Sequence, residues 1–159
     1  AACRGRSAAN AEARTRPAAA PAPFALVAGT PAGGLRDWIG DVRRALRPLP
    51  ATALRDASEA QKSALETYLT RQEYIEMYWG VTGKLTRGPE LGAAVKEAET
   101  RFHLILAQLQ PGHAPDAARL RAGIESLSEQ YDRVLAAAAA ARVPLDPHAL
   151  AARGTETHR

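Results

Sequence analysis

The chain is poor in cysteine and in aromatic residues. Cysteine occurs once in 159 residues, at Cys3, which excludes an internal disulfide framework and a metal site built from several cysteines. Only 5% of the residues are aromatic, and the many alanines bury little area, so we expect a thin hydrophobic core. The longest stretch without charge, residues 17–35, is broken by prolines and glycines and does not form a membrane-spanning helix. The length favours a single domain.

Basic residues outnumber acidic ones, and the excess lies near the N-terminus. The formal net charge is +4, but residues 1–33 carry four arginines and one glutamate, while the rest of the chain carries 17 basic and 16 acidic side chains. No predicted helix has a stripe of basic residues with interleaved aromatics, as a nucleic-acid-binding surface requires. We therefore expect no binding to nucleic acid.

Ala1-Ala2-Cys3 resembles the end of the lipobox of bacterial lipoproteins, in which small residues precede an acylated cysteine. The alanine- and proline-rich segment that follows is similar in composition to the tether of such lipoproteins. The resemblance implies a lipid anchor on Cys3, contact with the membrane surface, and a location on the periplasmic side of a bacterial membrane. The alternative is a free cysteine in an N-terminal segment that has lost its initiator methionine.

Composition divides the chain into three parts. Residues 1–33 form a low-complexity tether with too little apolar surface to fold alone, residues 34–143 form a helical body, and residues 144–159 form an irregular C-terminal tail. The tether contains a short apolar group that we expect to dock on a partner surface. The residues of this group are Phe24, Leu26 and Val27.

The spacing of apolar residues at three and four positions predicts four helices in the body. They cover residues 35–46, residues 52–80 with Thr52 as N-cap, residues 89–109 and residues 116–141. The connections are short, and the last two helices keep a regular apolar seam. The predicted fold is therefore all-α, an up-and-down antiparallel four-helix bundle with a long irregular N-terminal tail.

The second predicted helix has the most distinctive composition, with half of the aromatic residues between Tyr68 and Gly80. Its apolar pattern places Leu54, Leu65 and Leu69 on the inner face. Tyrosine, tryptophan and methionine are enriched at protein interfaces, so we expect a partner to contact the end of this helix. The expected contact residues are Tyr74, Met77, Tyr78 and Trp79. The alternative is that these side chains pack one end of the bundle.

Patterns typical of catalysis or metal binding are weak. Glu99 and His103 are four residues apart, but His103 follows the inward-facing Phe102 and therefore points outward, with too few further ligands for a metal site. Glu73 and Glu76 are typical of a charged helix surface. We expect no cofactor, no bound metal and no enzymatic activity.

The sequence thus predicts a non-catalytic accessory or scaffolding subunit, a lipid-anchored lipoprotein that docks on a membrane protein complex. A photosynthetic or respiratory complex is one candidate host. The alternative function is a periplasmic helical bundle that binds a small molecule or senses a metal, with polar residues near the inner face of the second helix lining a cavity. These residues are Gln61, Arg71 and Gln72.

Overall fold

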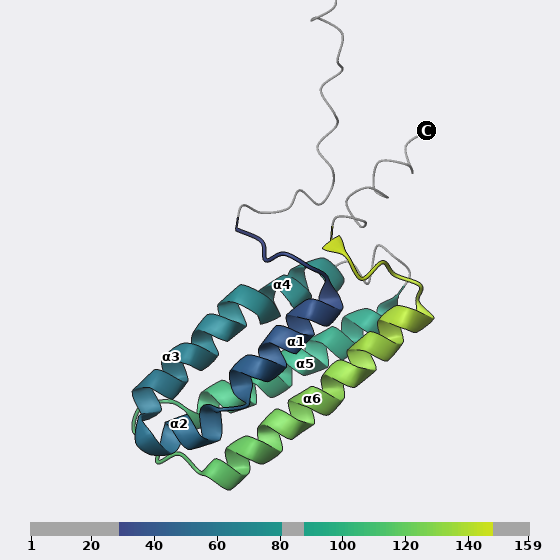
Figure 1. Cartoon of the computed structure of the whole chain (residues 1–159). Helices are drawn as coiled ribbons and strands as arrows, with labels where there is room; N and C mark the ends of the chain where they lie inside the picture. The colour runs from purple at the N-terminus through teal and green to yellow at the C-terminus, as the bar shows by residue number, and fades with distance from the viewer. Residues whose placement is uncertain (1–28, 81–87, 148–159) are drawn as a thin grey trace, which may run out of the picture.

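The computed structural model describes residues 29–80 and 88–147, and every regular element in these ranges is a helix (Figure 1). The all-α class predicted from the sequence is therefore confirmed. Within the described ranges, no helix combines the length and the hydropathy needed to cross a bilayer.

Helix α1 (Leu35–Leu46) forms where the apolar spacing predicted it. Its buried residues are those of the predicted inner face: Leu35, Trp38, Ile39, Val42 and Leu46. At its start, the carboxylate of Asp37 accepts a hydrogen bond from the N–H of Gly34 at 3.1 Å. The N–H of Leu35 donates to the carbonyl of Leu145 at 2.6 Å. A segment from near the other end of the chain therefore covers the beginning of α1.

The prolines after α1 begin a new helix. Helix α2 (Leu49–Arg55) has Pro50 in its first turn, where an N–H has no partner within the helix and its loss costs little. Thr52 lies inside α2, and its hydroxyl donates to the carbonyl of Pro48 at 3.1 Å. The φ angle of proline is fixed near the helical value, so Pro50 favours a helical turn. The sequence had instead predicted a non-helical connection between residues 46 and 52.

Helix α3 (Ala57–Thr67) is capped by Asp56. The backbone of Asp56 is extended, and its carboxylate accepts hydrogen bonds from the N–H groups of Ser58 at 3.0 Å and Glu59 at 3.1 Å. The prediction that Thr52 caps this helix is therefore wrong. The carboxylate satisfies two N–H groups of the first turn of α3, whereas the Thr52 hydroxyl is used by the preceding helix.

After α3 the chain remains helical up to Gly80, but part of it is π-helical. The segments are η2 (Tyr68–Gln72), α4 (Glu73–Ile75) and η3 (Glu76–Gly80). A π-helical turn holds more residues than an α-helical turn, so the side of the helix that faces the core shifts along the sequence. The buried residues of η2, α4 and η3 are Tyr68, Gln72, Ile75, Tyr78 and Trp79.

Three leucines that the pattern placed on the inner face are exposed. Leu54, Leu65 and Leu69 have exposed fractions of 64%, 46% and 47%, whereas Ala60 and Ala64 are fully buried. The prediction of an inward position for these leucines is therefore wrong. Alanines and leucines recur at the same spacing along this helix, so the spacing alone does not tell which of them face inward. The short side chains of Ala60 and Ala64 allow α3 to pack against α1 and α5.

The two longest helices follow the predicted pattern closely. Helix α5 (Pro89–Gln108) buries its predicted inner residues: Leu91, Val95, Ala98, Phe102 and Ile105. Helix α6 (Ala117–Ala140) begins after Asp116, whose carboxylate accepts hydrogen bonds from the N–H groups of Ala118 at 2.9 Å and Arg119 at 3.1 Å. The two helices pack against each other and form the most extensive contact between elements.

Helices α1, α3, α5 and α6 lie side by side, and α2 lies near one end (Figure 1). Polar side chains join neighbouring helices at their edges. Arg71 of η2 donates to the carboxylate of Asp41 in α1 at 2.8 Å, and Arg101 of α5 donates to the carbonyl of Ser126 in α6 at 2.9 Å. In the interior, the buried hydroxyl of Tyr131 donates to the side-chain oxygen of Gln72. These bonds fix the relative positions of the helices that carry the sites described next.

Candidate functional site

An aromatic cluster lies where the N-terminal half of α1 meets η3. It consists of Trp38, Tyr74, Tyr78 and Trp79. The ring of Trp38 makes edge-on contacts with the other three, with centroid distances of 5.9 Å to Tyr74, 5.8 Å to Tyr78 and 5.1 Å to Trp79. Tyr74 and Tyr78 stack with a centroid distance of 6.4 Å. The cluster is thus the main packing contact between α1 and η3.

The two indole N–H groups of this cluster donate hydrogen bonds to the backbone segments before α1 and after α6. The Nε1–H of Trp38 donates to the carbonyl of Ala32 at 3.0 Å, and the Nε1–H of Trp79 donates to the carbonyl of Pro144 at 3.3 Å. The hydroxyl groups of Thr30 and Tyr78 lie 3.4 Å apart. The cluster therefore fixes residues 29–33 and 144–147 against the helices.

The predicted partner-contact residues have different exposures. Trp79 and Tyr78 are buried by the chain's own side chains, Tyr74 is half-buried, and Met77 has an exposed fraction of 37%. Met77 and Tyr74 are therefore the members of this group whose side chains reach the surface. The remaining predicted sites, Cys3, Phe24, Leu26 and Val27, lie outside the described residues.

A polar cluster lies between η2, η3 and α5. The hydroxyl of Tyr68 is 3.0 Å from Nε2 of His103, which is 3.5 Å from the carboxylate of Glu99. Lys96 pairs with Glu99 and also lies 3.8 Å from the carboxylate of Glu76. The spacing of Glu99 and His103 was visible in the sequence, but the approach of Glu76 and Tyr68 depends on how η3 and η2 pack on α5.

The carboxyl groups of Glu76 and Glu99 influence each other, and their pKa values move apart. Burial, followed by the hydrogen bond to Glu99 and its charge, raises the pKa of Glu76 to about 7. Burial by itself raises the pKa of Glu99, but hydrogen bonds with Glu76 and Lys96 outweigh it, so this pKa is lowered. Of the two carboxyl groups, Glu76 is therefore the one that binds a proton more readily.

Burial, followed by the negative charge of Glu99, also raises the pKa of Tyr68 to about 12, so its hydroxyl keeps its proton beside His103. Across residues 29–80 and 88–147, no group of three or more histidine, cysteine, aspartate or glutamate side chains is arranged to hold a metal ion.

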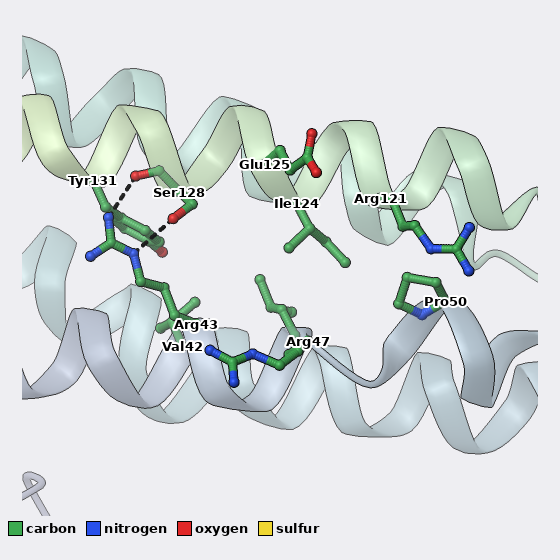
Figure 2. Close-up of a pocket in the computed structure, with 10 residues that line it drawn as sticks. Val42, Arg43, Arg47, Pro50, Arg121, Ile124, Glu125, Ser128 and Tyr131 are labelled. Carbon is green, nitrogen blue, oxygen red and sulfur yellow. Dashed lines mark hydrogen bonds between the residues drawn. The ribbon is translucent and has the colours of Figure 1, made fainter.

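A groove of about 350 Å³ lies between the C-terminal half of α1, the start of α2 and α6 (Figure 2). Apolar side chains form its floor, and polar side chains stand around them. The apolar residues are Val42, Leu46, Pro50, Ile124 and Tyr131, and the polar residues are Arg43, Arg47, Arg121, Glu125 and Ser128. Ile124 was expected in the core but is only partly buried, because it faces this open groove.

Arg43 is held at one end of the groove by α6. Its guanidinium donates to the hydroxyl of Ser128 at 2.8 Å, to the carbonyl of Ser128 at 2.7 Å and to the carboxylate of Asp132 at 2.7 Å (Figure 2 shows the bonds to Ser128). These bonds join α1 to α6 and keep this end of the groove in place.

This groove was not predicted from the sequence. The polar residues expected to line a cavity, Gln61, Arg71 and Gln72, are not among the residues that line it. The sequence pointed to the groove only through Arg43 and Arg47, which are four residues apart and therefore lie on one side of the helix. Arg121 reaches the opposite wall only because α1 packs on α6.

These features define an all-helical protein with a closed aromatic cluster, a polar cluster around Glu76 and Glu99, and an open basic groove. A scan of protein-family models, a search of curated proteins and a search of solved structures each find no match for the chain. The function must therefore be argued from the residues themselves.

Proposed function

We propose that this protein is a non-catalytic accessory subunit that a lipid on Cys3 anchors to the periplasmic side of a bacterial membrane. Its helical body docks on a larger membrane protein assembly, and residues 1–33 serve as the tether. In this proposal α1, the helix from α3 to η3, α5 and α6 form an up-and-down four-helix bundle. The lipobox-like N-terminus supports the anchor, and one surface feature supports the docking.

That feature is an apolar stripe along α3, η2 and η3, made of Leu65, Leu69 and Met77. Leu65 and Leu69 are four residues apart and share one side of the helix, and Met77 is exposed further along the same helix, in η3. All three side chains are exposed, although leucine and methionine are usually buried. Neighbouring exposed apolar side chains on a small protein are typical of an interaction surface. The stripe also extends the contact predicted at Met77.

Substitution of two stripe leucines tests the docking. We expect Leu65→Lys with Leu69→Lys to abolish co-purification with the host assembly from native membranes, because two charges would be buried in the contact. The matched control is Leu54→Lys with Leu104→Lys, which changes two exposed leucines on other helices. If the two double variants co-purify equally well, the stripe is not the docking surface.

Mass spectrometry of the native protein tests the anchor. We expect the N-terminal peptide that contains Cys3 to carry a thioether-linked lipid, and Cys3→Ser to release the protein from the membrane fraction. An unmodified Cys3 peptide from native membranes would contradict the anchor while leaving the docking proposal to be tested separately.

The α1–α6 groove favours a second candidate function, the binding of a small molecule. Its volume of about 350 Å³ lies within the usual range of small-ligand sites, and its apolar floor with polar surroundings is typical of them. A thermal-shift screen of small molecules tests this function, since a ligand that binds only the folded chain raises its melting temperature. Divalent metals belong in the same screen for the metal-sensing form of this function.

A further inference from the structure

Positively charged side chains outnumber negatively charged ones around the α1–α6 groove. Arg43 is paired with Asp132 at 2.7 Å, so its charge is compensated within the protein. Arg47 on α1 and Arg121 on α6 are exposed, and neither makes a side-chain hydrogen bond or ion pair in the described ranges. Glu125 is the acidic residue that lines the groove, and Figure 2 shows its carboxylate directed away from α1. The open part of the groove is therefore positively charged.

The floor beneath these arginines is apolar and well fixed. Val42, Leu46 and Tyr131 are buried core residues, and the Tyr131 hydroxyl is bound to Gln72, away from the groove. Ile124 projects from α6 between the two walls (Figure 2). The floor offers van der Waals contact, and the one hydrogen of the Tyr131 hydroxyl is already donated to Gln72. The apolar part of a ligand fits here better than a polar part does.

We propose that the groove binds a small amphiphilic anion, whose carboxylate is attracted by the exposed guanidinium groups of Arg47 and Arg121 and whose alkyl chain lies on Leu46, Pro50 and Ile124. Figure 2 shows the two guanidinium groups directed toward opposite ends of the groove, so either of them can meet the carboxylate. The guanidinium group suits this role because its planar donors match a carboxylate and it keeps its charge at any physiological pH. This inference names the ligand class for the second candidate function above and rests on it. It does not depend on the docking stripe, which belongs to α3, η2 and η3.

Octanoate and its uncharged analogue octanamide provide a direct test on the full chain. They share the alkyl chain and differ in the charge that the two arginines would recognise. We expect octanoate to bind by isothermal titration calorimetry and to shift the backbone NMR signals of Leu46 and Ile124, with octanamide binding more weakly. The binding of octanoate weakens as salt is added, because the arginines are exposed to solvent.

A pair of double variants separates the groove from general charge effects. Arg47→Gln with Arg121→Gln is expected to weaken octanoate binding about tenfold or more, as for the loss of a hydrogen bond to a charged group. Arg36→Gln with Arg119→Gln changes the same two helices by the same charge at residues that do not line the groove, and we expect no change in binding.

Each other result overturns the inference in a distinguishable way. Equal binding of octanoate and octanamide at Leu46 and Ile124 would refute the anionic ligand class but leave the small-molecule function standing. Octanoate binding that the Arg47 and Arg121 variant leaves unchanged would also refute it. If neither compound shifts the signals of the groove and the thermal-shift screen is flat, the inference and the second candidate function both fail.

Discussion

The two halves of α1 have very different surroundings. Around Trp38, aromatic rings fill the space, and both indole N–H groups of the cluster bind backbone carbonyls of the segments that flank the helices. Around Leu46, the same helix borders an open groove in which Arg47 and Arg121 have no polar partner in the described ranges. The flanking segments 29–33 and 144–147 cover the first half of α1, whereas no comparable segment in the described ranges covers the second half. We therefore expect substitutions in the closed half to change stability most and substitutions around the open half to change ligand binding most.

Removal of the central ring of the closed half should have the largest effect. We expect Trp38→Ala to lower the free energy of unfolding by about 3–5 kcal/mol, because three ring contacts and the bond to Ala32 are lost and a cavity remains. Chemical denaturation followed by circular dichroism measures this. The exposed Leu104→Ala should change stability by less than about 0.5 kcal/mol. A similar small loss for Trp38→Ala would mean that the closed half does not carry the stability.

Residues 144–147 cover the start of α1, and the methyl group of alanine at position 34 would displace them. A Cβ added at Gly34 would lie 2.0 Å from the carbonyl oxygen of Leu145, so Gly34→Ala must displace the segment that accepts the bond from Leu35. We expect a loss of about 1–3 kcal/mol in thermal or chemical unfolding. Gly40→Ala is the matched control, because its nearest neighbour is the flexible end of Arg44 at 3.9 Å, and it should be stabilising. Equal behaviour of the two variants would show that residues 144–147 do not close α1.

The floor of the open half is tested by Tyr131→Phe. This change removes the hydroxyl that donates to Gln72 and leaves a buried amide oxygen without that partner, so we expect a loss of about 1–2 kcal/mol. Tyr131→Phe combined with Gln72→Leu removes both polar groups and should recover part of the loss. Additive losses in this double-mutant cycle, measured by chemical denaturation, would argue against the bond.

The smallest effect is expected from the carboxyl pair beside the closed half. Because the pKa of Glu76 is about 7 in the folded chain against an ordinary value of 4.5, the folded state binds more protons between these values. The contribution of Glu76 to stability is therefore present below pH 4.5 and is lost as the pH rises to about 7. Melting temperatures of the wild type should fall over this window, and Glu76→Gln should reduce the fall. Glu73→Gln serves as the control, and if it reduces the fall equally, the pair with Glu99 is not the cause.

Much of the fold was predictable because it depends on local signals. In α5 and α6 the apolar residues alternate regularly, and large side chains such as Phe102 and Tyr131 mark the inner face without ambiguity. Around α2 and α3 the signals competed: Thr52 and Asp56 are both good caps, and alanines and leucines followed the same period. In the folded chain Asp56 is the cap of α3, and Ala60 and Ala64 lie in the core because of how α3 packs.

The candidate sites were less predictable, because their residues come from separate helices. The sequence showed aromatic residues between Tyr68 and Gly80, but Trp38 joins them only when α1 packs on η3. The sequence likewise showed Glu76 on a charged helix surface and Glu99 four residues before His103, and the influence of the two carboxyl groups on each other follows from the contact of η3 with α5.

The all-α class, the bounds of α1 and the inner faces of α5 and α6 follow from the sequence, because they depend on interactions within one or two helical turns. The exposure of Leu54, Leu65 and Leu69, and the position of Arg47 and Arg121 around one groove, depend on how the helices pack. The physical reason is that burial and charge proximity depend on distances between helices, and no local pattern encodes those distances.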